Sequence, residues 1–118
     1  MPSEPRPAID LVHLGTYTQG NLALERELLS MFLPSARDYI DAMAAGQDQA
    51  GGKTRGGVWW TAAHSLKGVA QGVGAWEIAA LAEAAESHGD SPLSVRRKDV
   101  ETLHAALERA RWFVANLA

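Results

Sequence analysis

The feature that most constrains the fold is a helical spacing of apolar residues along almost the whole chain. Apolar side chains recur three or four positions apart in each stretch between glycines and prolines, and no stretch alternates apolar and polar residues as a half-buried strand does. The chain has 118 residues, which suits one domain. Several amphipathic helices joined by short connections pack side by side. We therefore predict an all-α fold, an antiparallel four-helix bundle with a short additional N-terminal helix.

The N-terminal third is expected to hold a lead-in and two helices. Residues 1–8 are rich in proline, which blocks regular structure, so we expect a disordered lead-in there and one folded domain over 9–118. Asp10 is placed to cap a short helix and Asn21 a longer one, because their side chains can accept hydrogen bonds from the first backbone amides. Pro34 interrupts the apolar pattern of the longer helix and is expected to kink or split it.

Glycine and proline divide the remainder into a loop and three helices. Residues 46–57 contain five glycines and no large apolar side chain, so we expect a loop. A third helix is predicted over 58–73, with Gly74 at its end. A fourth follows, and the turn 89–92 separates it from a last helix that begins near Leu93. The glutamates of the fourth helix are expected to face outward: Glu77, Glu83 and Glu86.

Composition narrows the classes of function. The formal net charge is −3, and the basic run 96–98 is too short to suggest a nucleic-acid-binding face. The absence of cysteine excludes disulfides, thiolate chemistry and cysteine-bound zinc. No apolar run approaches the ~20 residues of a membrane span, and the N-terminal residues lack the apolar core of a signal peptide. We therefore expect a cytoplasmic protein that binds neither nucleic acid nor a membrane.

The third helix carries the candidate chemistry. At about 100° per residue, His64 lies opposite an apolar face of the helix. That face consists of Trp59, Ala62, Leu66, Val69, Ala70 and Val73. Lys67, Gly68 and Gln71 fall within about 60° of His64, and Trp60 lies on the same side one turn earlier. The sequence thus places one exposed imidazole in the middle of a solvent-facing strip.

The residues of this strip suit a histidine that carries a phosphoryl group. An exposed His64 offers an uncharged nucleophilic nitrogen at pH 7. Lys67 can stabilise an attached phosphoryl group, and Gln71 can donate a hydrogen bond to it. Gly68 leaves room beside the histidine, although glycine inside a helix costs ~1 kcal/mol relative to alanine. The same pattern would also arise if His64 had no function and Gly68 only let a neighbouring helix pack closely. Periodicity alone therefore does not establish that His64 is a functional residue.

The residues around His64 resemble the signature of histidine phosphotransfer (HPt) domains. That signature is H-x-[LI]-K-G, a glycine six residues later, and a following helix rich in leucine and alanine. The matching residues here are His64-Ser65-Leu66-Lys67-Gly68, Gly74-Ala75, Ile78, Leu81 and Ala85-Glu86. Residues 9–21 and 28–32 also resemble the first helices of free-standing bacterial HPt proteins. Ala85 stands where the family often has leucine, which is expected to loosen local packing without affecting the site.

The resemblance implies a phosphocarrier that is not an enzyme by itself. His64 would accept a phosphoryl group from the aspartyl phosphate of a response-regulator receiver domain, often in a hybrid sensor kinase, and pass it to another receiver. Lys67 and Gly68 match the lysine and glycine of the family motif. Catalysis would come from positioning and charge neutralisation. Because the sequence shows no acidic cluster near His64, the receiver would supply Mg²⁺, and we expect this protein to hold no cofactor of its own. We also expect the protein to be a monomer.

Other roles remain open for several side chains. Trp60 is a candidate partner contact because large exposed aromatic residues favour interfaces, or it packs against the short first helix. Gly68 and Gln71 are predicted to face the partner with it. His88 is expected to act as a cation near a helix C-terminus, and His13 to pack partly buried.

Two other functions also remain open. A metal-binding bundle would use paired Glu-x-x-His motifs, of which Glu101 and His104 supply one and Asp10 and His13 a weak imitation. An adaptor that binds receivers or kinases without being phosphorylated would have the same fold, although the intact His64-Lys67-Gly68 set argues against it.

Overall fold

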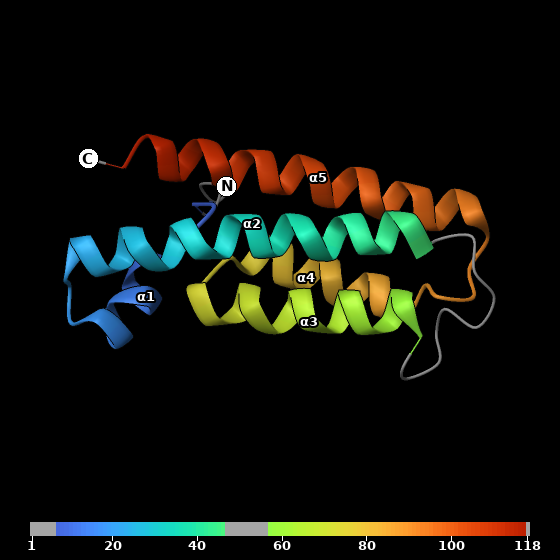
Figure 1. Ribbon diagram of the computed structural model, residues 1–118, viewed down its shortest axis with the longest axis horizontal. Coiled ribbons are helices and arrows are strands. Elements are labelled where there is room, and N and C mark those ends of the chain that lie inside the picture. The colour runs from blue at the N-terminus through green and yellow to red at the C-terminus, as the bar shows by residue number, and fades with distance from the viewer. Residues whose placement is uncertain (1–6, 47–56, 118) are drawn as a thin grey trace, which may run out of the picture.

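The computed structural model describes residues 7–46 and 57–117, which form five helices and no strand. The helices are α1 (Leu11–Thr18), α2 (Leu22–Gly46), α3 (Val58–Val73), α4 (Trp76–Glu86) and α5 (Leu93–Ala115). Helices α2 to α5 lie side by side and run in alternating directions, and α1 lies across one end (Figure 1). The predicted all-α fold with four long helices and a short first one is confirmed.

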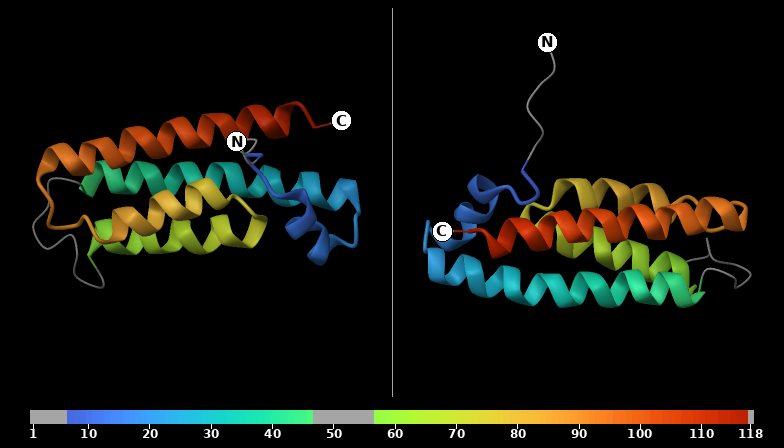
Figure 2. Two further views of the ribbon diagram at one scale, coloured as in Figure 1. Left: turned by 180° about the vertical axis from the view of Figure 1, so that it is seen from behind. Right: turned by 90° about the horizontal axis from the view of Figure 1, so that it is seen from above.

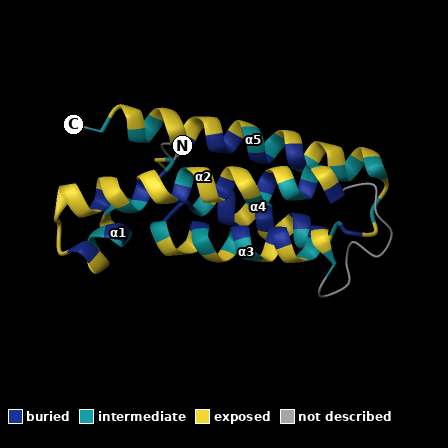
Figure 3. Cartoon of the chain, in the orientation of Figure 1, coloured by how far each residue is buried: buried dark blue, intermediate teal, exposed yellow. Residues whose placement is uncertain are grey.

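The four long helices form a closed ring around one core. Helix α3 contacts α2 and α4, and α5 contacts the same two helices, so α3 and α5 occupy opposite corners of the bundle (Figure 2). Buried positions face inward and exposed positions outward along each helix (Figure 3). The largest fully buried side chains include Leu29, Ile40, Trp59, Leu66 and Leu103, which come from α2, α3 and α5. None of the described helices has the length and apolar character needed to cross a membrane.

The predicted apolar face of α3 packs into this core. Trp59, Ala62, Leu66 and Ala70 are buried, while Val69 and Val73 lie at its margin and pack against it. This face sets the rotation of α3 about its own axis, because turning the helix would expose these side chains to water. The opposite face, which carries His64, therefore points to solvent.

Both predicted caps form, and of the two outcomes predicted for Pro34 the split does not occur. The Asp10 carboxylate accepts a hydrogen bond from the His13 amide at 3.1 Å, and the Asn21 side chain accepts one from the Leu24 amide at 3.1 Å. Pro34 does not split α2, which continues to Gly46. Pro34 is exposed, so its ring lies on the side of the helix where water can replace a lost backbone hydrogen bond.

Two sequence predictions fall partly outside the described residues. The predicted lead-in includes residues 1–6, and the predicted glycine-rich loop includes 47–56, neither of which the structure describes. At the edges of that loop, Gly46 is the last residue of α2 and Gly57 caps α3. The predicted turn before α5 is confirmed, since residues 89–92 lie between α4 and α5.

Gly74 forms the corner between α3 and α4 and holds the start of α1. Its backbone adopts a left-handed conformation with φ 77°, and its carbonyl accepts a hydrogen bond from the Asp10 amide at 2.9 Å. The Trp76 indole donates to the Asp10 carboxylate at 2.9 Å. This indole bond and the His13 amide lower the pKa of the Asp10 carboxyl. The corner therefore joins three helices at one end of the bundle.

We expect Gly74→Ala to lower the free energy of unfolding by about 2 kcal/mol. A Cβ atom at Gly74 would lie 2.9 Å from the Asp10 carbonyl oxygen and 3.0 Å from the Asp10 Cβ, and the left-handed backbone adds strain. Urea unfolding measures the difference. Gly72→Ala is the matched control, because a Cβ there meets no atom within 4 Å. The control should keep or raise stability, and equal losses in both variants would contradict this account of the corner.

Candidate functional site

His64 lies in the middle of α3 with its ring in solvent. Its side chain is 53% exposed, whereas Ala63 and Leu66 beside it are fully buried. The face predicted from helical spacing is therefore the face that the fold leaves open.

Two neighbours hold the imidazole of His64. The Trp60 indole stacks on one ring face, with 4.5 Å between ring centroids and 11° between ring planes. On the ring edge, Nδ1 lies 2.9 Å from Oε1 of Glu86 on α4. An ionised carboxylate can only accept, so Nδ1 carries the hydrogen and donates it. In the neutral ring Nε2 then keeps a free lone pair and is the ring nitrogen able to act as a nucleophile.

Lys67 shares the same carboxylate with His64. Its ammonium nitrogen lies 3.8 Å from Oε1 of Glu86 and 3.9 Å from Oε1 of Glu83. The lysine side chain is 23% exposed, so most of its stem packs against the protein while its charge stays on the His64 side of α3. The shared carboxylate therefore brings a cation to the same side of α3 as the His64 ring, and a cation there can offset the charge of an anion attached to that ring.

Gly68 and Gln71 complete the open strip along α3. Both are exposed, and a Cβ added at Gly68 would meet no atom within 4 Å. Within the part of the chain that the structure describes, no neighbouring helix approaches closely enough to require glycine at this position, so the packing explanation of Gly68 is wrong. The open space beside His64 remains available to an approaching molecule.

Glu86 is the site residue that sequence reasoning missed. The prediction that all three glutamates of this helix point outward holds for Glu77 and Glu83, but the Glu86 side chain is only 16% exposed because it faces α3. A usable signal was present. His64 precedes the Gly74 corner by about as many residues as Glu86 follows it, and such positions lie opposite each other in an antiparallel helix pair.

The Trp60 indole lies against the imidazole of His64. Helix α3 begins at the end of the bundle far from α1 (Figure 1), so the alternative that Trp60 packs against the first helix is wrong. The indole stays half-buried and reaches the surface next to the imidazole.

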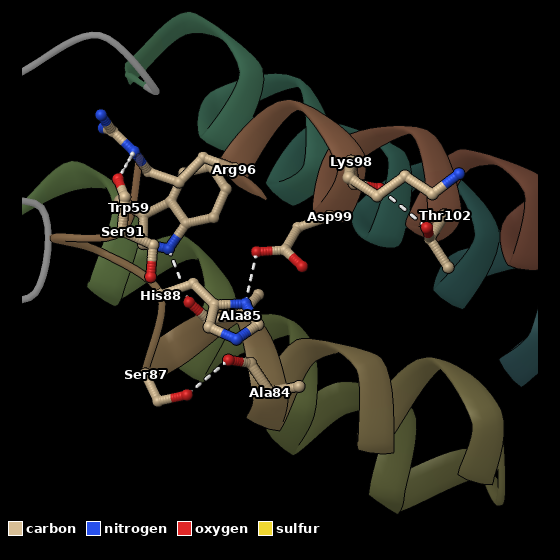
Figure 4. A network of polar contacts seen from close by, with 10 residues as sticks. All are labelled: Trp59, Ala84, Ala85, Ser87, His88, Ser91, Arg96, Lys98, Asp99 and Thr102. Atoms are coloured by element: carbon tan, nitrogen blue, oxygen red, sulfur yellow. Dashed lines mark hydrogen bonds and ion pairs between the residues drawn. The ribbon is translucent and has the colours of Figure 1, made fainter. Parts of the chain in front are cut away.

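The other three histidines lie away from this site. His88 Nδ1 is 2.8 Å from the Asp99 carboxylate, in a network at the α4–α5 turn (Figure 4). His13 packs edge-on against Tyr17 and Trp76, partly buried as predicted. His104 Nε2 lies 3.9 Å from the Asp41 carboxylate. Within residues 7–46 and 57–117, no group of three or more histidine and acidic side chains could hold a metal ion.

Comparison with known proteins adds one finding. A family model described as Hpt domain matches residues 27–111, more than half of the chain. The match includes all of α3 and α4 and therefore His64, Lys67 and Glu86. Neither the curated proteins nor the solved structures contain a significant match.

Proposed function

The chain belongs to the Hpt domain family, and from this we propose that it carries a phosphoryl group on His64 between receiver domains of a two-component phosphorelay in the cytoplasm. Hpt domains are phosphocarriers that work with receiver domains and kinases, and they are not enzymes on their own. The observation that best supports the proposal is the exposed imidazole whose Nδ1 is bound by Glu86, so that Nε2 is the ring nitrogen left to react.

The proposed reaction is an in-line displacement at phosphorus. Nε2 of His64 attacks the phosphorus of a receiver aspartyl phosphate, the N–P bond forms, and the P–O bond to the aspartate breaks. The aspartate leaves as a carboxylate, and the reverse reaction delivers the group to a second receiver. Lys67 offsets the negative charge of the phosphoryl group on this chain, and the receiver supplies Mg²⁺.

We further propose that the receiver docks over the outer face of α3 and the adjoining edge of α2. Gly68 and Gln71 are exposed beside His64. A shallow apolar groove of about 260 Å³ lies between α2 and the second half of α3 and includes Met31, which is 62% exposed, with Leu28 and Val69. Such a groove offers apolar area to a partner that docks on α2 and α3.

The test is a transfer experiment with a receiver domain that a hybrid kinase has phosphorylated. We expect label to move from the receiver to this protein and to be stable in base and labile in acid, as an N–P bond is. A protein that binds the receiver but takes up no label would be an adaptor, and this result would refute the proposal.

Lys67→Ala is expected to slow the transfer about 10-fold, because a charge-assisted contact to the phosphoryl group is lost. The rate of label uptake and the half-life of the phosphorylated protein measure the effect. Lys98→Ala is the matched control, since Lys98 is an exposed lysine on α5. If Lys67→Ala left both the rate and the half-life unchanged, Lys67 would have no part in the site.

A further inference from the structure

We propose that Trp60 is a positioning residue for His64: its indole fixes the plane of the imidazole and favours the positive charge that the ring acquires when it takes up the phosphoryl group. This inference rests on the proposed function of His64. It gives Trp60 a role within the chain itself, distinct from the partner contact expected from its position on the open side of α3.

The stack follows from the helix that carries both residues. Positions four apart lie one above the other on the same helix face, and helical side chains lean toward the N-terminus. The His64 ring therefore leans over Trp60, and the two rings lie nearly parallel at 11° with 4.5 Å between centroids. Trp59, the preceding residue, is fully buried in the core and fixes the direction in which Trp60 leaves the helix.

One hydrogen bond alone would leave the imidazole poorly oriented. The bond from Nδ1 to Glu86 fixes one edge of the ring, but a ring held at one atom can still pivot about that bond. The side chain is 53% exposed, so little else restrains it. Contact with the flat indole removes the pivoting motion, because tilting the ring would break the stack. Indole and carboxylate together direct Nε2 along one line, as an in-line displacement requires.

The charge on the ring changes during the transfer. When Nε2 forms the N–P bond and the aspartyl P–O bond breaks, the electron pair of that bond leaves with the aspartate. The imidazole keeps its Nδ1 hydrogen and becomes a positively charged ring. A cation is attracted to the face of an indole, so the Trp60 contact strengthens as the N–P bond forms. An interaction that is stronger in the transition state than before it accelerates the step.

Three variants test the proposal in single-turnover transfer from a phosphorylated receiver. For Trp60→Leu we expect the rate constant at saturating receiver to fall about 10-fold, while the Kd for the receiver changes less than about 2-fold. Trp60→Phe should recover most of the rate, because a phenyl ring can still stack. Trp112→Leu is the matched control, since Trp112 is a 69% exposed tryptophan on α5, the helix opposite α3.

If Trp60→Leu left the rate constant at saturating receiver unchanged, the positioning role would be overturned. The same holds if the variant slowed transfer only by raising the Kd for the receiver. Absence of label on the wild-type protein would instead refute the proposed function, so the two failures are distinguishable.

Nuclear magnetic resonance of the imidazole gives a second measurement that needs no receiver. In the wild-type protein, the ring protons of His64 should shift upfield because they lie over the indole, and the ring nitrogens should show hydrogen on Nδ1. Trp60→Leu should remove the upfield shift, whereas Trp112→Leu should keep it. Wild-type ring protons without an upfield shift would show that the stack does not form in solution and would overturn the proposal.

Discussion

Replacing His64 by glutamine is expected to abolish phosphoryl uptake completely and to leave the melting temperature within about 4 °C of wild type. Glutamine keeps a polar side chain at an exposed position but has no nucleophilic nitrogen. The imidazole contributes only a partly exposed hydrogen bond to Glu86 and a surface stack on Trp60, so its removal should cost about 1 kcal/mol or less. Label transfer and a thermal unfolding curve measure the two effects on the same sample.

His104→Gln is the control for this variant. His104 is also on a helix surface, with its side chain 45% exposed, but it lies on α5, away from the candidate site. It should take up label as the wild-type protein does. Residual label on the His64→Gln protein would mean that another residue accepts the phosphoryl group, and a large loss of stability would mean that His64 is part of the core.

Trp59→Ala is expected to lower the free energy of unfolding by about 3–5 kcal/mol, the largest stability effect that we predict. The Trp59 side chain is fully buried, and its indole donates a hydrogen bond to the Ala85 carbonyl at 2.7 Å, which ties the start of α3 to the end of α4 (Figure 4). Truncation would leave a cavity in the core and remove the indole hydrogen bond to the Ala85 carbonyl. Urea unfolding followed by circular dichroism measures the loss.

The neighbouring tryptophan provides the comparison for that variant. Trp60→Ala should cost about 1–2 kcal/mol, because Trp60 is half-buried, whereas Trp59 is fully buried. Trp59→Phe should fall between the two, since it keeps an aromatic ring but not the indole N–H. Similar losses for Trp59→Ala and Trp60→Ala would contradict the assignment of one tryptophan to the core and the other to the site.

The sequence predicted the helices well because their signals are local. Asp10 and Asn21 are good caps wherever the rest of the chain lies, and α3 ends at Val73 because Gly74 tolerates a positive φ. Local signals did not decide whether Pro34 would kink or split its helix. The effect of a proline inside a helix depends on whether water reaches the backbone there, and exposure is a property of the whole fold.

The residues of the candidate site that lie on α3 were predicted from the sequence, but the residue that α4 contributes was missed. Helical spacing alone placed His64, Lys67, Gly68 and Gln71 on the open face of α3. Glu86 lies on α4, and its contact with His64 depends on the rotation of α4 against α3, which the spacing of α4 alone does not determine. The same holds for Trp60, since spacing indicated the correct side of the helix but not that its ring stacks on the imidazole.

The phosphoryl group is proposed to travel on one nitrogen of one histidine, and this is tested most simply by locating the group. The wild-type protein is labelled by a phosphorylated receiver, kept at alkaline pH, and mapped by mass spectrometry and phosphorus magnetic resonance. The chain has four histidines. We predict one phosphoryl group per chain, on Nε2 of His64. A phosphoryl group on another residue, or on Nδ1 of His64, would contradict the account.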